Sequence, residues 1–430
     1  MSLKGVHISE GAIGANVSGD SREFGLVVTG DSISGKLSFD TVYRLRRLAD
    51  AVAIGIDSEY DKTKKIHLYR HISEFYRMAG EGKILNLLVV DRKTDIKNSS
   101  FAAKMSEVVK TMVAESTLIS DIAFGFNLAG DTDMDTPVNG LSPHVSEGIE
   151  EGQKLAVWCD ENDMPLHVII EGRNMGTDVT GIMDLRAYKK DTGAVDGNNQ
   201  PIMVIMEAEK VSVVVGQDWS YAEGGEVQWK KHYADVGTFL GCVAAQAWNR
   251  NPGEVETMTL TDAVQDEWMI GGLSNHKKYA EVFEQLETLD EKGYIFPIRY
   301  TGISGYWWNG GHCCVEIVLD SKGNLNQHEI YYSHTIDQSK RALRTAFLPE
   351  VKKPVTLENG WISSDMLGYY NSIGNMVFNA MEGKGLISSG RTKTDPTSDL
   401  VIGKVLQVSF EVVPTGMVNY ISGTINLKGS

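Results

Sequence analysis

The stretch VLQVSFEVVPTGMVNYISGTINLK, residues 405–428, contains two alternating runs separated by a short break. In the first run, 406–412, apolar side chains fall on one side of an extended chain and polar side chains on the other. This period of two predicts a half-buried strand. Pro414, Thr415 and Gly416 then end the pattern, because proline and glycine interrupt regular structure.

The second run, 418–427, alternates again and predicts another strand, with Ile421, Ile425 and Leu427 on one side. A last strand leaves one edge unpaired unless something covers it, and such an edge can pair with another chain. The run leaves two alternatives open. It is either a strand within the chain's own sheet or an arm that pairs with a neighbouring subunit.

Composition and charge restrict the possible classes of function. The 430 residues are too many for one compact core, so two or three domains are expected. A net charge of −16 argues against nucleic acid as the main partner. No apolar run has the length of a membrane span, and we expect no membrane insertion. Four cysteines, two of them adjacent, suit a disulfide framework poorly and indicate reduced thiols in a cytoplasmic protein.

Strands and helices alternate through residues 21–265, which predicts an α/β layer architecture. The near-continuous apolar runs at 24–30 and 84–90 are typical of strands that are covered on both faces. Helical spacing of apolar residues predicts helices at 41–53 and 101–115.

Irregular sequence at 251–275 predicts a domain boundary. Beyond it we expect an α+β domain. It contains a strand pair near 313–319 and 329–332 and two helices, at about 335–348 and 363–381.

The sequence GDSISGKL at 30–37 lies between a predicted strand and a predicted helix, as a phosphate-binding P-loop does. Lys36 would reach the phosphates, but Leu37 stands where a hydroxyl group would hold magnesium. A nucleotide-binding enzyme that uses the turn from Gly30 to Lys36 is therefore the alternative function. A chance glycine turn is the commoner explanation of such a match.

Other groups of polar residues do not form a convincing catalytic or metal site. The acidic run at 131–135 begins like a calcium loop, but Thr136 and Ser142 occupy the positions of its glycine and its closing acid. The His-Cys-Cys run at 312–314 would point to opposite faces of a strand. We expect no catalytic residues, no bound metal and no cofactor.

One predicted helix, 335–348, carries a basic face against the acidic background. Lys340, Arg341 and Arg344 lie on one side, opposite apolar residues. An ordinary solvated face is the simplest explanation. If the protein assembles on an acidic surface, these three residues are the candidates for the contact.

The order of these elements resembles contractile tail sheath proteins. The resemblance is carried at the N-terminus by GVHISEGAI followed by GLVVTG, and in the middle by YIFPIRYTG at 294–302. It continues through TIDQSKRALRTAFL, SSDMLGYYNSIGNMVFNAM and the closing FEVVPTGMVNYISGTINL. Within that family the chain looks most like the divergent sheaths of Bacteroidetes-type phages or contractile injection systems.

The resemblance implies a multi-domain fold with β-strand arms at both ends. By it, residues 1–20 form an N-terminal arm, 21–265 an outer α/β domain, 276–404 an inner α+β domain that faces a tube, and 411–430 a C-terminal linker strand. The arms would pair with neighbouring subunits through Val6, Ile8, Val418, Tyr420, Ile421, Ile425 and Leu427, and Pro414 and Gly416 would form the hinge.

The resemblance also implies a mechanical function. Sheath subunits polymerise as stacked hexameric rings around an inner tube and contract to drive it through a target envelope. The expected partners are further copies of this chain, the tube protein, and baseplate and tail terminator proteins. Lys340, Arg341 and Arg344 would contact the tube, and no nucleotide is needed. Assembly would take place in the bacterial cytoplasm, and the product would be a phage virion or an injection particle.

Overall fold

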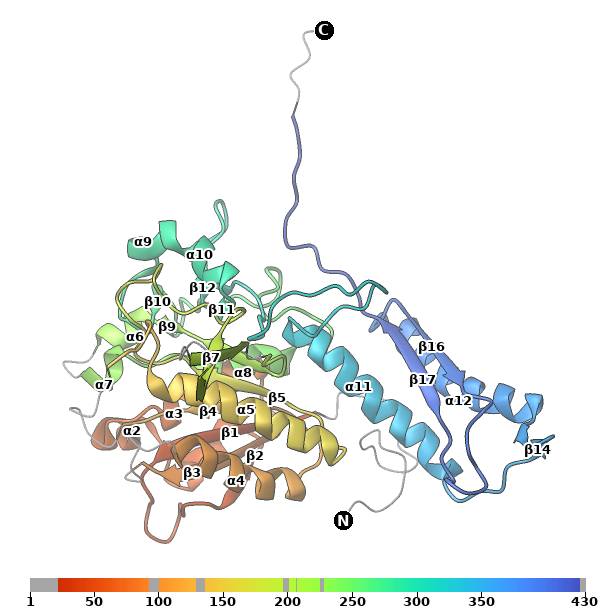
Figure 1. Cartoon of the computed structure of the whole chain (residues 1–430). Coiled ribbons are helices and arrows are strands. Elements are labelled where there is room, and N and C mark those ends of the chain that lie inside the picture. The colour runs from red at the N-terminus through yellow and green to blue at the C-terminus, as the bar shows by residue number, and fades with distance from the viewer. Residues whose placement is uncertain are drawn as a thin grey trace. The chain divides into compact units, whose positions relative to one another are not determined.

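The chain divides into two compact units, Met1–Val351 and Lys352–Ser430 (Figure 1). The computed structural model describes residues 22–92, 100–128, 136–195, 201–205, 207–224 and 228–425. This division differs from the predicted one. The irregular region 251–275 lies inside the first unit, because the chain beyond it returns to the same sheet as strand β11 (Tyr294–Ile295).

In the described part of the first unit, seven strands form one sheet in the order β11-β8-β5-β4-β1-β3-β2. Every neighbouring pair is parallel except β2 and β3, which are antiparallel at one edge. The remaining bounds are β1 (Glu23–Gly30), β2 (Val42–Leu45), β3 (Leu85–Asp91), β4 (Ile119–Gly125), β5 (His167–Glu171) and β8 (Val211–Val214). The prediction of an α/β layer architecture is confirmed.

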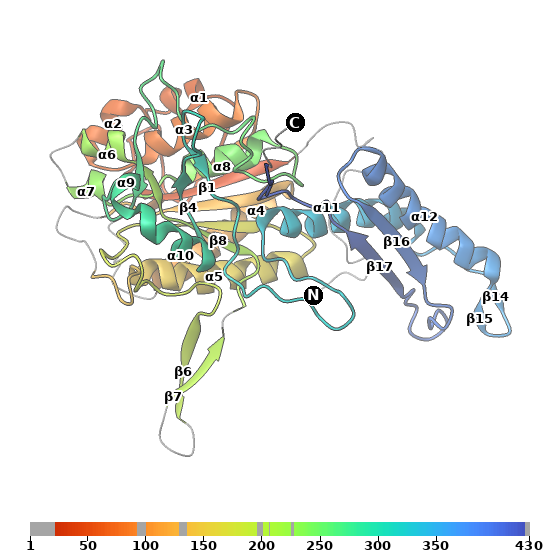
Figure 2. The same ribbon diagram turned by 90° about the horizontal axis from the view of Figure 1, so that it is seen from above.

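Helices cover both faces of this sheet, which is why its strands are apolar on both sides. Figure 2 shows α3 (Leu68–Ala79) and α8 (Val236–Ala245) on one side and α5 (Pro143–Glu161) on the other. Helix α4 (Ser100–Glu115) packs against α5 and β3. The short helices α1 (Leu48–Ala53) and α2 (Ser58–Lys64) pack against α3.

The helix predicted at 41–53 is wrong in its first half. Residues Val42–Leu45 form β2 and pair with Leu85–Leu88 of β3. Arg44 also forms an ion pair with Glu23 on β1, across the sheet edge. The partners of this segment are far away in the sequence, and their pairing overrides a local spacing that suits a helix.

The strand predicted near 329–332 is also wrong, because Ile330 begins the long helix α11 (Ile330–Phe347). Only an isolated bridge, between His312 and Glu329, remains of the expected strand pair. The other elements of the first unit are short: β6 (Lys189–Val195), β7 (Pro201–Ile205), β9 (Gly216–Asp218), α6 (Trp219–Glu223), α7 (Gln228–Lys231), β10 (Gly271–Leu273), α9 (Tyr279–Val282), η1 (Phe283–Gln285), α10 (Leu286–Glu291), β12 (Pro297–Ile298), β13 (Trp307–Trp308) and η2 (Leu348–Glu350).

The second unit consists of one long helix and two small antiparallel strand pairs. Helix α12 (Ser364–Gly383) packs against β16 (Ser389–Thr394), which pairs with β17 (Val408–Val413). A short hairpin of β14 (Leu357–Glu358) and β15 (Trp361–Ile362) precedes the helix. No helix in the described ranges is both long and apolar enough to cross a membrane.

Candidate functional site

The carboxyl edge of the parallel sheet is the first place to look for a ligand. In open α/β sheets, ligands bind where neighbouring strands connect in opposite directions, here between β1 and β4. Thr29 and Asn127 close this gap. The Thr29 hydroxyl donates to the Asn127 carbonyl oxygen at 2.9 Å, and the Asn127 amide Nδ2 donates to the Thr29 carbonyl oxygen at 2.7 Å. The Asn127 side chain also accepts from the His67 backbone N–H at 2.8 Å, so the crevice is filled.

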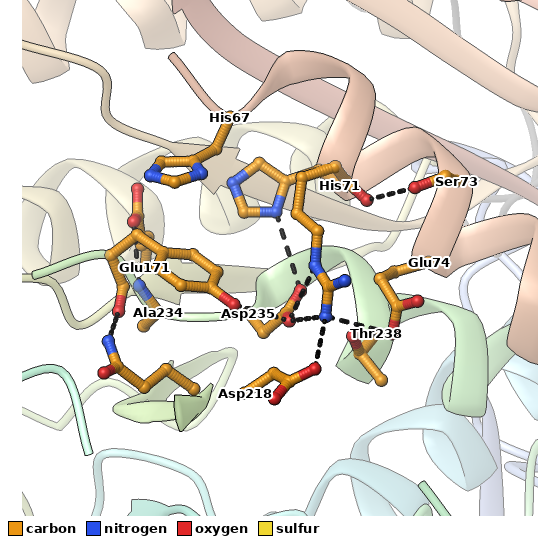
Figure 3. A network of polar contacts seen from close by, with 12 residues as sticks. His67, His71, Ser73, Glu74, Glu171, Asp218, Ala234, Asp235 and Thr238 are labelled. Atoms are coloured by element: carbon orange, nitrogen blue, oxygen red, sulfur yellow. Dashed lines mark hydrogen bonds and ion pairs between the residues drawn. The ribbon is translucent and has the colours of Figure 1, made fainter. Parts of the chain in front are cut away.

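Beside this edge lies a buried ionic network between α3 and α8 (Figure 3). The guanidinium of Arg70, only 3% exposed, lies 3.0 Å from Asp235 and 3.3 Å from Asp218. It also pairs with Glu267 and with Glu74, one helical turn along α3. These carboxylates raise the pKa of Arg70, although burial alone would lower it. The Arg70 charge is therefore compensated by several carboxylates, although burial still raises the pKa of Asp235 and Glu267.

Two titratable side chains of this network, His71 and Glu74, are poorly suited to acid–base catalysis near neutral pH, whereas burial raises the pKa of Glu267 to about 7. Burial, and then the nearby Arg70, lower the pKa of His71 to about 3, so its imidazole is neutral near pH 7. Burial opposes ionisation of Glu74, but Arg70 and Arg77 lower its pKa to about 2. The network joins α3, β9 and α8 in a fixed arrangement, which is a structural role.

The Gly30–Lys36 turn does not form a phosphate-binding loop. Ile33 and Leu37 exchange backbone hydrogen bonds of 2.8 and 2.9 Å, which close the segment into a tight turn. The next element is the strand β2, so no helix N-terminus faces the turn. A P-loop requires that helix, and the nucleotide-binding alternative receives no support.

The other candidate ligand groups are engaged in structural contacts. Within the described ranges, no group of His, Cys, Asp and Glu side chains is arranged to hold a metal ion. His312 lies 2.6 Å from Glu329 and 2.9 Å from Asp290, while Cys313 and Cys314 are buried. The acidic run 131–135 lies outside the described residues.

Helix α11 lies along the amino edge of the sheet and is held there by buried polar contacts. His334 Nε2 lies 2.6 Å from Asp121 Oδ1 on β4. Lys210, just before β8, donates to Asp337 at 2.5 Å. Burial opposes the ionisation of Asp121, but the imidazole of His334 lowers the pKa of this carboxyl group to about 2. These contacts fix the helix to two different strands.

The basic face of α11 is used within the chain. Arg341 is 7% exposed and donates to three main-chain carbonyl oxygens, those of Thr117, Ile119 and Pro165. Lys340 pairs with Asp160 at 2.6 Å, and Arg344 pairs with Asp163. The three basic side chains of α11 therefore do not form a freely exposed face. Acidic residues at the C-terminal end of α5 and just after it, and main-chain carbonyl groups near the amino edge of the sheet, bind them within the chain. Arg341 in particular is an internal anchor.

The small sheet of the second unit has one covered face and one polar face. Thr392 and Thr394 of β16 point toward α12 and are 5% and 4% exposed. The opposite face carries Arg391, which pairs with Glu411 of β17 at 2.7 Å. In the described part of the chain, β17 pairs with β16 and with no other strand.

Beyond β17 the chain runs on through residues 414–425 without regular structure. Its apolar side chains are in solvent: Val418 is 79% exposed, Tyr420 84%, Ile421 85% and Ile425 98%. No hydrogen bond joins residues 416–425 to the described part of the chain. The strand predicted at 406–412 is confirmed by β17, and the strand ends, as expected, at the Pro414 break. Pairing of the following segment with a neighbour stays a prediction, and Val6, Ile8 and Leu427 lie outside the described residues.

Comparison with known proteins gives the family. A sequence model described as the N-terminal domain of DUF2586 matches residues 5–312, more than half of the chain. The chain belongs to the DUF2586 family. No curated protein matches it.

Solved structures show which fold this DUF2586 chain has. A chain of the anti-feeding prophage baseplate, six-fold symmetrised, is similar over 100% of this chain and 99% of its own, with 12% identity and a TM-score of 0.57. The contracted helical sheath of the anti-feeding prophage matches over 99% and 97%, with 10% identity and a TM-score of 0.56. The contracted sheath complex of the extracellular contractile injection system PVC matches over 99% and 98%, with 9% identity and a TM-score of 0.50.

The resemblance to contractile tail sheath proteins is thus confirmed for the fold of the DUF2586 chain. The likeness extends over both compact units, and so includes the second unit, which the DUF2586 model does not reach. The sequence predicted a contact surface on α11. It did not predict that the Arg341 side chain is buried within the same chain. Acidic residues at 160–163 pair with the basic residues of α11. The sequence contains both groups, but only the fold brings them together.

Proposed function

We propose that this chain is a structural subunit of a contractile sheath. It polymerises as stacked hexameric rings around an inner tube and contracts to drive the tube through a target envelope. The observation that carries the proposal is the exposed segment 414–425, with Ile425 98% in solvent, in a chain that has the sheath fold over nearly its whole length. Aliphatic side chains on an extended segment are retained where another chain covers them.

The arms add strands to the sheets of neighbouring subunits. Main-chain hydrogen bonds supply the strength of such pairing, and alternate side chains supply its register. Pro414 and Gly416 act as the hinge between β17 and the C-terminal arm, while the first unit rotates as a rigid body. The hydrogen bonds between Thr29 and Asn127 and the ion pairs of Arg70 suit that rigidity. The energy of contraction comes from contacts between subunits, so the protein is not an enzyme.

The proposed partners are other copies of the chain, the inner tube protein, and baseplate and tail terminator proteins. Residues 21–265 form the outer region and about 276–404 the inner, tube-facing region. Lys340, with a side chain 36% exposed, and Arg344 remain candidates for tube contact, and Arg341 is not retained. Assembly takes place in the bacterial cytoplasm, and the product is a phage virion or an injection particle.

Electron microscopy of the purified chain tests the proposal. The full chain is expected to form sheath-like polymers. A variant that lacks residues 415–430 is expected to remain small, because it has lost the arm but keeps β17, which ends at Val413. Both proteins should unfold at about the same temperature, since the described residues beyond the hinge, 417–425, make no hydrogen bond to the rest of the described chain.

A matched control separates this function from the nucleotide-binding alternative. Lys36→Ala changes the one lysine of the candidate loop and should leave polymers unchanged. A stable monomer that is indifferent to the deletion would contradict the sheath function. Thermal protection by ATP that disappears in Lys36→Ala would restore the alternative.

A further inference from the structure

The loop that connects β16 and β17 is held in one conformation by its own backbone. At its tip, the Asp399 carboxylate accepts hydrogen bonds from three successive main-chain N–H groups, those of Val401 at 3.2 Å, Ile402 at 2.9 Å and Gly403 at 2.8 Å. The Val405 N–H then donates to the Asp399 carbonyl oxygen at 3.0 Å and closes the turn. A carboxylate that binds successive N–H groups fixes such a turn locally, so the tip is ordered before it meets any partner.

The side chains at this tip are apolar and exposed. Val401 is 67% exposed, Ile402 87% and Val405 54%, and the side chain of Lys404 is exposed between them. Single exposed aliphatic side chains are ordinary, but here three lie within one ordered turn. We call residues 399–405 the knob. Because the knob is ordered in advance, a partner that covers it pays little conformational entropy.

The first unit carries an exposed aromatic surface where α9, η1 and α10 meet the loop after β12 (Figure 1). The ring of Phe283, 62% exposed, lies 5.7 Å from the ring of Tyr279, measured between centroids. Tyr279 in turn lies 5.8 Å from Tyr306, over which the Arg299 guanidinium lies at 5.4 Å. Tyr300, 38% exposed, follows Arg299. Aromatic residues and arginine are enriched in protein interfaces, so this composition indicates a contact surface.

Carboxylates border the aromatic surface. Glu284 and Glu287 are exposed, and Glu287 lies four residues after Phe283 on a helical stretch, so the two side chains are neighbours. Among the residues that the structure describes, neither carboxylate has an ion-pair partner. In a chain of net charge −16, most surfaces would repel this one. The knob, which is apolar and carries a lysine, complements it in both respects.

We propose that the knob of one copy of this chain packs on the aromatic surface of a second copy. Ile402 lies against the ring of Phe283, and Lys404 pairs with the carboxylates of Glu284 and Glu287. Because the two surfaces are different, the contact is head-to-tail, and such contacts extend into rings or helical filaments. The inference rests on the proposed sheath function and adds to it a contact between subunits that involves neither terminal arm.

Charge reversal in the full chain tests the ionic part of this contact. Lys404→Glu should raise the protein concentration at which polymers form by about tenfold or more, because like charges then face each other. Glu284→Lys with Glu287→Lys should have a similar effect. A chain with all three substitutions has opposite charges again and should polymerise at close to the original concentration. Lys322→Glu, at another exposed lysine, makes the same change in net charge and should have no effect.

Two further substitutions test the apolar tip and the turn that presents it. Ile402→Ser should raise the polymerisation concentration by roughly tenfold and leave the unfolding temperature unchanged, because the side chain is in solvent in the isolated chain. Asp399→Ala removes the acceptor that orders the turn and should weaken polymerisation too. Asp399→Asn keeps one acceptor oxygen, so its effect should be smaller.

Disulfide cross-linking between separately purified full-length variants identifies the surface that the knob contacts. One chain carries Ile402→Cys, and the other carries Phe283→Cys or, as the control, Val52→Cys on α1, a site 46% exposed. A disulfide requires Cβ atoms about 4 Å apart, so the yield of cross-linked dimer should be about tenfold higher with Phe283→Cys. The native cysteines are buried and do not compete.

Several outcomes would overturn the inference and leave the sheath function standing. One is polymers that form at the same concentration in Lys404→Glu and Ile402→Ser as in the unaltered chain. Another is equal cross-linking with Val52→Cys and Phe283→Cys. A third is a bond that forms only within a single chain carrying both Ile402→Cys and Phe283→Cys. A chain that cross-links as expected but never polymerises supports the contact and contradicts the sheath function, whereas a chain that does neither contradicts both.

Discussion

The interior of the first unit buries charged side chains, whereas the last described residues of the second unit expose aliphatic side chains. Around Arg70, several carboxylates pair with the buried guanidinium, and the backbones of α3 and α8 are in close contact. In the segment beyond β17, aliphatic side chains such as that of Ile425 are exposed to solvent. The difference predicts that stability and the proposed assembly depend on separate residues. Changes in the first region should alter unfolding, and changes in the second should alter polymerisation.

The largest loss of stability is expected from filling the contact between α3 and α8. A Cβ atom on Gly237 would lie 2.3 Å from the His71 carbonyl oxygen. Gly237→Leu should lower the free energy of unfolding by more than about 4 kcal/mol, because the backbone of α3 must move. Denaturant titration of the purified chain measures this change.

Gly368 provides the matched control for that substitution. It lies within α12 with no atom close to its missing Cβ, so Gly368→Ala should stabilise by roughly 0.5 to 1 kcal/mol. Equal effects of the two glycine substitutions would contradict the close packing of α3 against α8.

The next largest effect concerns the pair that fixes α11 to the sheet. Asp121→Asn leaves the buried His334 without its carboxylate and should cost about 3 kcal/mol of stability at pH 7. The pKa of Asp121 is lowered from 3.8 to about 2, so its contribution is fully present above pH 4 and is lost as the pH falls toward 2. Unfolding measured from pH 5 to pH 2 should be steeper in the natural chain than in the variant. Parallel curves would contradict the pair.

His312 should make the free energy of unfolding depend on pH in the opposite direction. Burial opposes its protonation, but Glu329 and Asp290 raise its pKa from 6.5 to about 9. Its stabilisation is present below pH 6.5 and is lost as the pH rises through 9, by about 3 kcal/mol in total. Unfolding of His312→Gln should lack this decline between pH 6.5 and pH 9.5. A variant with the same decline would assign it to another group.

The smallest effect on stability is expected in the arm. Ile421→Ser with Ile425→Ser should change the free energy of unfolding of the isolated chain by less than about 0.5 kcal/mol, because both side chains are in solvent. The same variant should lose polymers in sedimentation and electron microscopy. Val264→Ser, at a site 95% exposed in the first unit, is the control and should leave both measurements unchanged. A destabilised arm variant would show that the arm packs on its own subunit.

Local sequence patterns predicted the helices and strands whose hydrophobic periodicity matches their secondary structure. The continuous apolar runs of β1 and β3 and the helical spacing of α12 were readable in the sequence. Residues 42–45 were misread as helix, because a strand at the sheet edge is defined by its pairing with β3. Ile330 was misread as strand, because the first turn of α11 is apolar where it is buried.

Some features of the candidate site follow from local sequence, and others depend on contacts between residues far apart in the chain. Alternation and the Pro414 break predicted β17 and its end, because an extended segment keeps its own period of two, and the role of the following residues as an arm stays a prediction. The role of Arg341 was not predictable, since its acceptors are carbonyl groups more than 170 positions away in the sequence. The pairing of Asn371 and Asn375 with β16 was also missed. Two asparagines one turn apart on a helix that precedes an alternating strand were the available signal.

The closure of β16 by α12 has a consequence for the shape of any polymer. The outward N–H groups of Thr392 and Thr394 on β16 donate to the side-chain oxygens of Asn375 and Asn371 on α12. Two sheets cannot join through their β16 edges into an open aggregate, which is the usual hazard of a small two-stranded sheet.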